Sequence, residues 1–241
     1  MTIQIITRRL LTSSLFFIFS ATGIHAQEPA GQKQTMLYWA EQLADHINRD
    51  NTDYRHKDES VSWDPYQSYA DCSGFINALL KKTFEQPDIL KEWFGKSRPL
   101  AAQYFDAITN GHHFSIISSI AQIRPGDLIV LKYTDKSEHD DNTGHCLLVE
   151  ELPVSIRPVD ILEPGTLQYA IRVIDSSRSP HGKDDTRHAP GGNSYAGLGK
   201  GIFRLYADRD GKITGYSWSQ GKPLPGFDPF ANAIIVGRMI P

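Results

Sequence analysis

The chain has 241 residues and a formal net charge of −3, and 40% of its residues are hydrophobic. This length suits one domain that buries a core of its own. A mildly acidic chain without blocks of Lys and Arg lacks the electrostatic footprint of a nucleic-acid-binding protein, so no nucleic-acid partner is expected.

The first 26 residues have the pattern of a signal peptide. Arg8 and Arg9 precede a short, mostly apolar run, and Ala26 is a small residue before a polar stretch. The run is shorter than the roughly 20 residues that span a bilayer. We therefore expect residues 1–26 to be removed and residues 27–241 to form a single domain that is secreted or periplasmic, without stable membrane insertion. An uncleaved membrane anchor is the alternative.

Helical periodicity dominates the next part of the chain. Apolar residues recur at spacings of three and four over residues 36–47, which predicts an amphipathic helix. The polar residues 48–69 are predicted to form a loop. A second helix is expected to begin at Cys72, because Asp71 is a favourable N-cap and an apolar stripe follows it. Residues 90–108 are expected to add short helices.

Strand patterns replace helical patterns from Pro125 onward. The predicted strands are residues 127–133, 144–152, 168–176, 202–207, 213–218 and 233–240. Between two of them, Asp208–Gly211 is typical of a hairpin turn rather than of a calcium loop. The glycine-rich residues 197–201 are interpreted as flexible backbone. These patterns predict an α+β fold, with helices packed on one face of a largely antiparallel sheet.

Cys72 is the candidate nucleophile. In the first turn of a capped helix, unpaired N–H groups and the positive end of the helix dipole favour a thiolate and lower its pKa. Gly74 keeps the approach to the sulfur open because it has no side chain. Two structural interpretations compete with this one: a small buried residue at a helix start, and a disulfide with Cys146 in an oxidising compartment.

A catalytic thiolate needs a base, and His145 is the candidate among nine histidines. Strand alternation places His145 on one face with apolar residues, whereas the other histidines lie in polar contexts. Asp175 ends another predicted strand on its core-facing side, where a carboxylate needs a partner such as this imidazole. The alternatives are a histidine satisfied within the core and an aspartate that begins a turn.

The same alternation turns Cys146 to the face opposite His145. The proposed chemistry brings Cys72 to the face of His145, so a disulfide would have to pass through the sheet. The short Cβ separation of a disulfide does not permit this. We therefore predict two free thiols, a reactive Cys72 and a buried, inert Cys146.

Substrate contacts are expected close to the start of the second helix. Aromatic residues just upstream of it are predicted to form one wall of a cleft, and a charged residue after Asp175 is placed to meet a peptide carboxylate. The candidate substrate-binding residues are Trp63, Tyr66, Tyr69, Ser73 and Arg178. For Arg178, Lys183 and Arg187, ordinary surface charge is the competing interpretation. The polar run 139–141 is typical of a solvated loop, and the sequence predicts neither a metal site nor a cofactor.

The ordered motifs DCSGF, RPGDLIVL and GHCLLVEE, followed by a strand that ends in a polar residue, resemble the NlpC/P60 group of papain-like cysteine peptidases. The resemblance covers about residues 69–176. It implies a papain-like fold with a Cys72 nucleophile, a His145 base and Asp175 as the orienting residue, and it implies cell-wall peptides as substrates. In that family the third residue is more often His, Asn or Gln, and the segment 85–122 is long here.

These observations predict an exported cysteine hydrolase that cleaves amide bonds through an acyl-enzyme. The expected substrate is a peptide or a peptidoglycan fragment. A thiol acyltransferase or a lipid-directed acyl hydrolase could use the same three residues, and a non-catalytic cell-wall binding protein could keep the fold. The oligomeric state is left open by the sequence.

Overall fold

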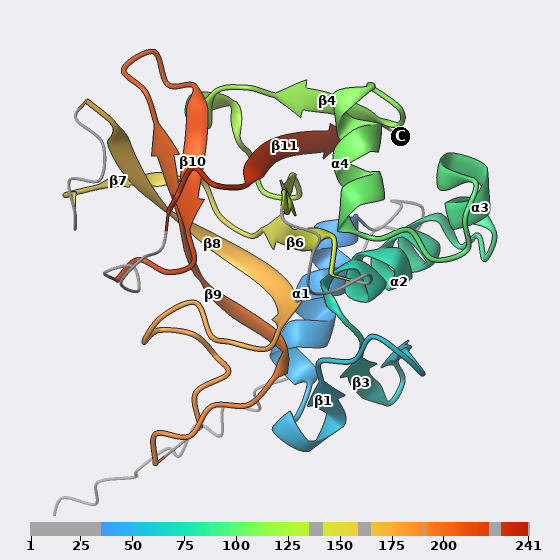
Figure 1. Cartoon of the computed structure of the whole chain (residues 1–241). Coiled ribbons are helices and arrows are strands. Elements are labelled where there is room, and N and C mark those ends of the chain that lie inside the picture. The colour runs from blue at the N-terminus through green and yellow to red at the C-terminus, as the bar shows by residue number, and fades with distance from the viewer. Residues whose placement is uncertain (1–34, 135–141, 159–164, 190, 222–227, 241) are drawn as a thin grey trace, which may run out of the picture. The chain divides into compact units, whose positions relative to one another are not determined.

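The computed structural model describes residues 35–134, 142–158, 165–189, 191–221 and 228–240. They belong to one compact unit that spans Lys33–Pro241, whereas the predicted signal peptide lies outside the described residues. The helices are α1 (Met36–His46), η1 (Arg49–Asn51), α2 (Cys72–Phe84), α3 (Ile89–Phe94), α4 (Ala101–Thr109) and η2 (Ile120–Gln122). Figure 1 labels the four α-helices. Among the described residues, no helix is both long enough and apolar enough to cross a membrane.

The main sheet has eight strands in the order β10-β9-β8-β6-β5-β11-β4, with β7 paired to β8. Every neighbouring pair in it is antiparallel. Its strands are β4 (Phe114–Ile117), β5 (Leu128–Lys132), β6 (Gly144–Val149), β7 (Val154–Ile156), β8 (Leu167–Ser177), β9 (Gly197–Ala207), β10 (Ile213–Ser217) and β11 (Ala233–Met239). The predicted α+β class with a largely antiparallel sheet is thereby confirmed.

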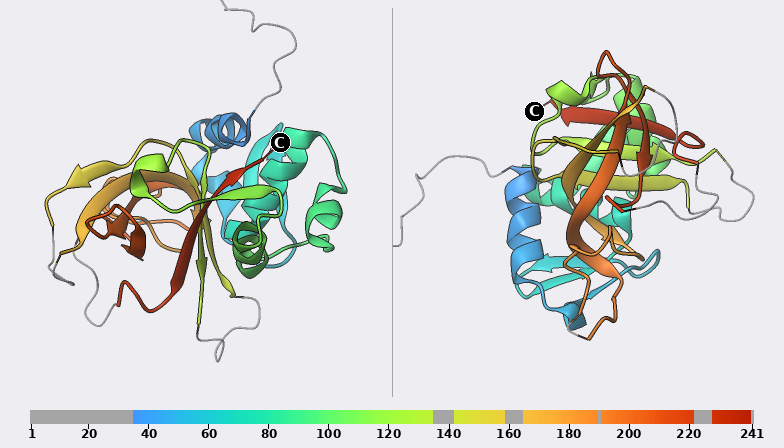
Figure 2. Two further views of the ribbon diagram at one scale, coloured as in Figure 1. Left: turned by 90° about the horizontal axis from the view of Figure 1, so that it is seen from above. Right: turned by 90° about the vertical axis from the view of Figure 1, so that its left-hand side faces the viewer.

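Two hydrophobic cores lie on the two faces of the main sheet. Cys146 and Leu148 of β6 join the core formed with α1, α2 and α4, while Leu147 and Val149 join the other. This separation follows from the alternation of side chains along a strand. The four α-helices gather on one side of the sheet, whereas η2 contributes Ile120 to the second core (Figure 2).

Residues 48–69, predicted to be loop, instead hold η1 and a second, three-stranded sheet. Its strands are β1 (Thr52–Asp53), β2 (Ser60–Trp63) and β3 (Tyr66–Tyr69). The prediction was wrong because these strands are short and their buried residues, Thr52 and Ser68, are polar, so the strands lack a sustained alternation of apolar residues. The small sheet leads directly into Asp71 and α2.

The glycine-rich residues 197–201, interpreted as flexible backbone, form the first half of β9. A Cβ atom on Gly199 would lie 2.7 Å from Arg187 Nε, and one on Gly201 would lie 2.3 Å from Asp185 Oδ2. Glycine is needed here because the loop after β8 packs directly on the strand. The predicted hairpin turn at 208–211 is confirmed, since β9 and β10 pair across it.

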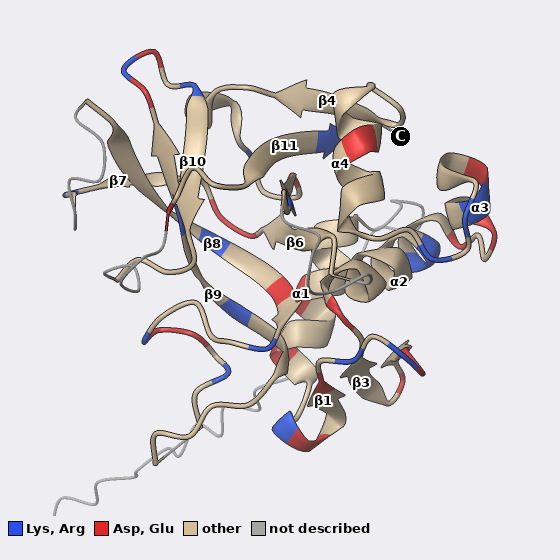
Figure 3. Ribbon diagram, in the orientation of Figure 1, with Lys and Arg blue, Asp and Glu red and all other residues tan. Residues whose placement is uncertain are grey.

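Charged residues also occur on the central strands β8 and β9 (Figure 3). Two of them are fully buried, Asp175 on β8 and Arg204 on β9. Buried charges are costly unless they are paired and hydrogen-bonded. The partners of Asp175 define the candidate site.

Candidate active site

Asp71 is the N-cap of α2, as the sequence predicts. One oxygen of its carboxylate accepts hydrogen bonds from the Gly74 N–H at 2.7 Å and from the Ser73 hydroxyl at 2.8 Å. The other oxygen contacts Arg98 at 2.7 Å and His56 at 2.9 Å. Burial favours a higher pKa for Asp71, but these hydrogen bonds and charges hold the pKa below its usual value. The cap is therefore anionic and fixed.

Cys72 follows this cap in the first turn of α2, and only 4% of its surface is exposed. The Cys72 pKa is lowered to about 5, first by a hydrogen bond with Cys146 and then, against the effect of burial, by the charge and hydrogen bond of His145. The sulfur lies 4.0 Å from the Gly144 carbonyl at the start of β6. These interactions favour the thiolate form of the candidate nucleophile.

The imidazole of His145 lies between the sulfur and a carboxylate. Its Nε2 is 2.6 Å from Asp175 Oδ2 and donates to it, which leaves Nδ1 for the thiol. Burial lowers the pKa of His145, but the Cys72 thiolate and Asp175 outweigh burial and raise that pKa to about 10. Cys72 and His145 therefore form a thiolate–imidazolium pair. The structure brings together the three predicted catalytic residues.

Asp175 is fully buried and has further partners from the loop after β8. Its Oδ2 lies 3.0 Å from His181 Nε2, and its Oδ1 lies 2.7 Å from Arg187 Nη2. Arg187 in turn pairs with Asp185 at 2.9 Å. Burial would raise the pKa of Asp175, but the charges of Arg187 and His181 hold it well below its usual range. Asp175 is therefore ionised.

Trp218 covers the two imidazoles. Its ring centroid is 4.9 Å from that of His145 and 4.5 Å from that of His181. Phe203 packs edge-on against His181 at 5.8 Å. These rings restrict water around the charged groups, and a low local dielectric strengthens the hydrogen bonds among them.

Tyr54 is a further titratable residue that interacts electrostatically with Cys72. Burial, and then the negative charge of Cys72, raise the pKa of Tyr54, so its hydroxyl stays protonated. The guanidinium of Arg178 lies 5.3 Å from the centre of the Tyr54 ring. Arg178, one of the predicted substrate contacts, thus lies beside Tyr54. Sequence analysis missed Tyr54 because it lies in the segment that was interpreted as loop.

The other predicted substrate contacts bond within the chain. The Trp63 indole donates to the Trp39 carbonyl at 2.8 Å, and the Tyr69 hydroxyl donates to the Asp50 carbonyl at 3.2 Å. Tyr66 stacks on His46, with the ring centroids 4.9 Å apart. The hydroxyl of the buried Ser73 donates a hydrogen bond to Asp71. Their roles in substrate binding stay predictions.

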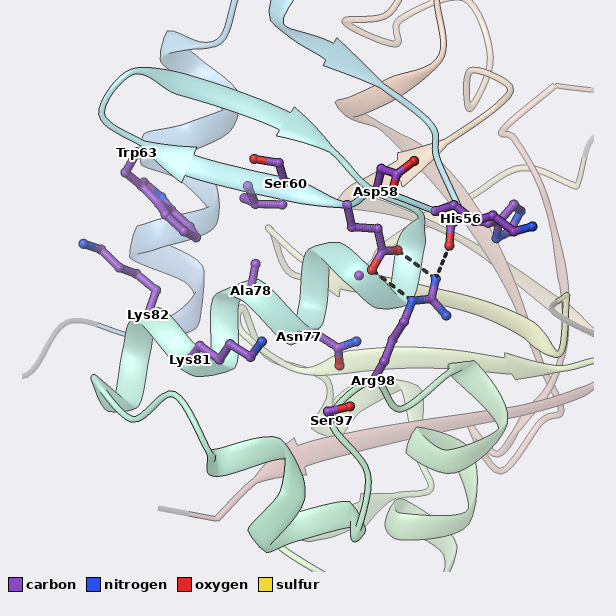
Figure 4. A pocket seen from close by; sticks show the side chains of 14 residues that line it. His56, Asp58, Ser60, Trp63, Asn77, Ala78, Lys81, Lys82, Ser97 and Arg98 are labelled. Carbon is purple, nitrogen blue, oxygen red and sulfur yellow. Dashed lines mark hydrogen bonds and ion pairs between the residues drawn. The ribbon is translucent and has the colours of Figure 1, made fainter.

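A cavity of about 840 Å³ lies along the outer face of α2 (Figure 4). Trp63, Lys81 and Lys82 line it, and Arg98 crosses it to pair with Glu59. The volume falls in the range of small-molecule sites. None of the three triad residues lines this cavity, although His56 and Gly74, which hydrogen-bond with Asp71, do.

A metal ion is the competing explanation for the group His145, Asp175 and His181, whose ligand atoms lie within 4.8 Å of one another. Zinc bonds of about 2.0–2.1 Å in tetrahedral geometry place ligand atoms roughly 3.3 Å apart. The two contacts of Asp175 Oδ2 are shorter, at 2.6 and 3.0 Å. Direct hydrogen bonds fit these distances better than a tetrahedral zinc centre does.

Three residues of the site were predicted to lie on the surface or were not considered. His181 and Arg187, taken as solvated, are buried, and Asp185 joins them. The sequence held one signal: a buried Asp175 needs positive partners, and the charged loop that follows it is the nearest source. The choice among the cations of that loop depends on close packing against β9.

The arrangement of the two cysteines also requires a correction. Both are free and buried, but the sheet does not separate them. Cys72 packs in the same core as Cys146 and hydrogen-bonds with it. The predicted separation by the sheet was wrong because it required Cys72 to lie on the face of His145. Cys72 instead lies on the helical face and reaches His145 close to Gly144, at the beginning of β6.

Comparison with known proteins gives one informative match. Uncharacterized protein R653 of Acanthamoeba polyphaga mimivirus is 38% identical over 220 residues, which cover 85% of this chain and 96% of that protein. No family model matches the chain, and neither does any solved structure. The similarity extends over almost the whole of the viral protein.

Proposed function

The chain belongs to one family with the mimivirus protein R653, and we propose that it is a cysteine hydrolase that cleaves amide bonds through an acyl-enzyme. One observation carries the proposal: Cys72 begins a capped helix within hydrogen-bond reach of an imidazole that Asp175 holds at 2.6 Å. This is the geometry of an activated nucleophile, a base and an orienting group. It also supports the proposed papain-like arrangement.

The reaction begins with attack of the Cys72 thiolate on the carbonyl carbon of an amide. A carbon–sulfur bond forms, and the carbonyl oxygen becomes an oxyanion. The proposed donors that stabilise it are backbone N–H groups at the start of α2 and the protonated Tyr54 hydroxyl. His145 then gives its proton to the leaving nitrogen as the carbon–nitrogen bond breaks.

Water completes the cycle. Neutral His145 takes a proton from a water molecule, whose oxygen attacks the thioester, and the carbon–sulfur bond breaks to release a carboxylic acid. Cys72 returns as a thiolate and His145 as an imidazolium. Throughout, Asp175 keeps the ring oriented and stabilises its positive charge, as its 2.6 Å contact allows.

The proposed substrate class is a peptide, and specifically a peptidoglycan stem peptide. Support comes from the NlpC/P60-like order of motifs and from the export signal that the sequence predicts. Arg178 stands beside Tyr54, where a guanidinium can bind the carboxylate that such peptides carry. Export to a secreted or periplasmic location belongs to the same proposal.

Product analysis tests this function. The full chain is incubated separately with muropeptides and with acylated lipid substrates, and the products and the protein are measured by mass spectrometry. We expect peptide cleavage and a transient acyl adduct on Cys72, both absent from Cys72→Ala. Transfer of an acyl group to another amine or alcohol would identify an acyltransferase. Absence of turnover and adduct with every substrate would favour a binding protein.

A further inference from the structure

Both ring nitrogens of His181 face oxygen atoms that can only accept hydrogen bonds. Nδ1 lies 2.7 Å from the carbonyl oxygen of Trp218, and Nε2 lies 3.0 Å from the carboxylate of Asp175. A neutral imidazole has one N–H, so it would leave a lone pair against one of these oxygens. Because His181 is 1% exposed, water cannot relieve that repulsion. The contacts require a proton on each nitrogen.

The charges around His181 lead to the same assignment. Asp175 contacts it from β8, Asp185 accepts a hydrogen bond from its backbone N–H at 2.7 Å, and Arg187 pairs with both carboxylates. His145, on β6, has its ring centroid 6.5 Å away. The two carboxylates balance Arg187 and one further positive charge.

The net charge of this buried group is zero whether Cys72 is a thiol or a thiolate. With Cys72 as a thiol and His145 neutral, the buried group is neutral only if His181 is an imidazolium. Transfer of the proton from Cys72 to His145 adds one negative and one positive charge, so the sum stays zero. A buried group with zero net charge avoids the large cost of an uncompensated ion.

We propose that His181 is a positioning residue that is held as an imidazolium. It extends the triad into a hydrogen-bonded chain of four residues: Cys72, His145, Asp175 and His181. This inference rests on the proposed function. Through its bond to Asp175, His181 fixes the carboxylate that orients His145. Its positive charge also favours the thiolate and limits how strongly Asp175 retains the proton on His145.

Nitrogen NMR tests the protonation of His181 without a substrate. In the full chain labelled with ¹⁵N-histidine, at neutral pH, an imidazolium shows two protonated ring nitrogens and a neutral ring shows one. The signal is assigned by its disappearance in His181→Gln, or from contacts with Trp218 if that variant does not fold. We expect two protonated nitrogens. A single protonated nitrogen would overturn the assignment.

Thiol alkylation tests the positioning role. The rate at which iodoacetamide labels Cys72 is measured against pH in the wild-type chain and in His181→Gln, whose amide keeps a donor toward Asp175 but carries no charge. The pH at which labelling begins is expected to rise by roughly half a unit or more, because a positive charge near the thiolate is lost. His188→Gln is the matched control, because His188 is exposed in the same loop.

A structural role alone would lower the stability of His181→Gln without moving the pH at which labelling begins, and that result would overturn the positioning role. Failure of the proposed function has a different signature. In that case wild-type Cys72 would react only at alkaline pH, like an ordinary thiol, while His181 would still show two protonated nitrogens.

Discussion

Cys146 gives the Cys72 sulfur a hydrogen-bond donor in addition to His145. Burial raises the pKa of Cys146 well above its ordinary value, so this residue stays a thiol. Its S–H can therefore donate to the thiolate of Cys72, and this contact is the largest cause of the lowered Cys72 pKa. The second cysteine is part of the electrostatics of the site.

Substitution of Cys146 tests this contribution. We expect Cys146→Ala, which has no donor, to raise the pH at which iodoacetamide begins to label Cys72 by roughly one unit. In Cys146→Ser the hydroxyl keeps a donor, so this variant should lie closer to the wild-type chain. Equal profiles for the alanine and serine variants would show that the donor is unimportant.

At the scale of one element, the cap of α2 links helix stability to the candidate site. Asp71 accepts a hydrogen bond from the Gly74 N–H and also forms an ion pair with Arg98. Asp88 precedes α3 but makes no side-chain capping bond. The two aspartates thus form a matched pair of helix starts, one capped and one not.

We expect Asp71→Ala to lower the free energy of unfolding by about 1–2 kcal/mol for the lost cap, while Arg98 keeps its pair with Glu59. Asp88→Ala should change it by less than about 0.5 kcal/mol. Urea unfolding of both variants measures the difference. Similar losses in the two variants would contradict the account of the cap.

The cap also shows which features can be predicted from a sequence. A capping aspartate before Cys72 is a local pattern, and alternation along β6 and β8 correctly assigned His145 and Asp175 to a core-facing side. Contacts between distant segments were not predictable in this way. The approach of Cys72 to Cys146 depends on how α2 packs on the sheet, and the burial of Arg187 depends on glycines in β9.

At the scale of the whole molecule, the fold class followed from the change from helical to strand periodicity, but the order of strands did not. The main sheet pairs β6 with β8, although the 17 residues 150–166 lie between these two strands in the sequence. This pairing places an imidazole beside a carboxylate. Part of the free energy of unfolding therefore depends on the buried ion pairs of the candidate site.

Arg187 is the strongest test of that dependence. It is fully buried between Asp175 and Asp185. Arg187→Met leaves these carboxylates without their main cation, and we expect the free energy of unfolding to fall by roughly 3–5 kcal/mol. Lys91→Met removes an exposed pair with Asp88 and should cost at most about 1 kcal/mol. A small loss for Arg187→Met in urea unfolding would contradict the ion-pair account.

Stability should also fall in acid. The pKa of Asp175 in the folded chain lies well below its ordinary value of 3.8, so folding favours the ionised form. This contribution is fully present above the unfolded pKa and is lost as the pH falls through the folded pKa. Urea midpoints measured from pH 7 downward should therefore decrease below about pH 4. Midpoints that stay constant there would contradict this linkage.

The pH dependence of Cys72 alkylation tests the central claim most directly. Iodoacetamide labelling of the full chain is followed by intact mass and peptide mapping, with His145→Gln as the comparison. The account predicts that labelling of Cys72 begins near pH 5, that Cys146 is labelled only after denaturation, and that His145→Gln moves the onset toward the ordinary thiol value of 9.0. A wild-type onset near pH 9, unchanged in His145→Gln, would contradict the thiolate–imidazolium pair and the function built on it.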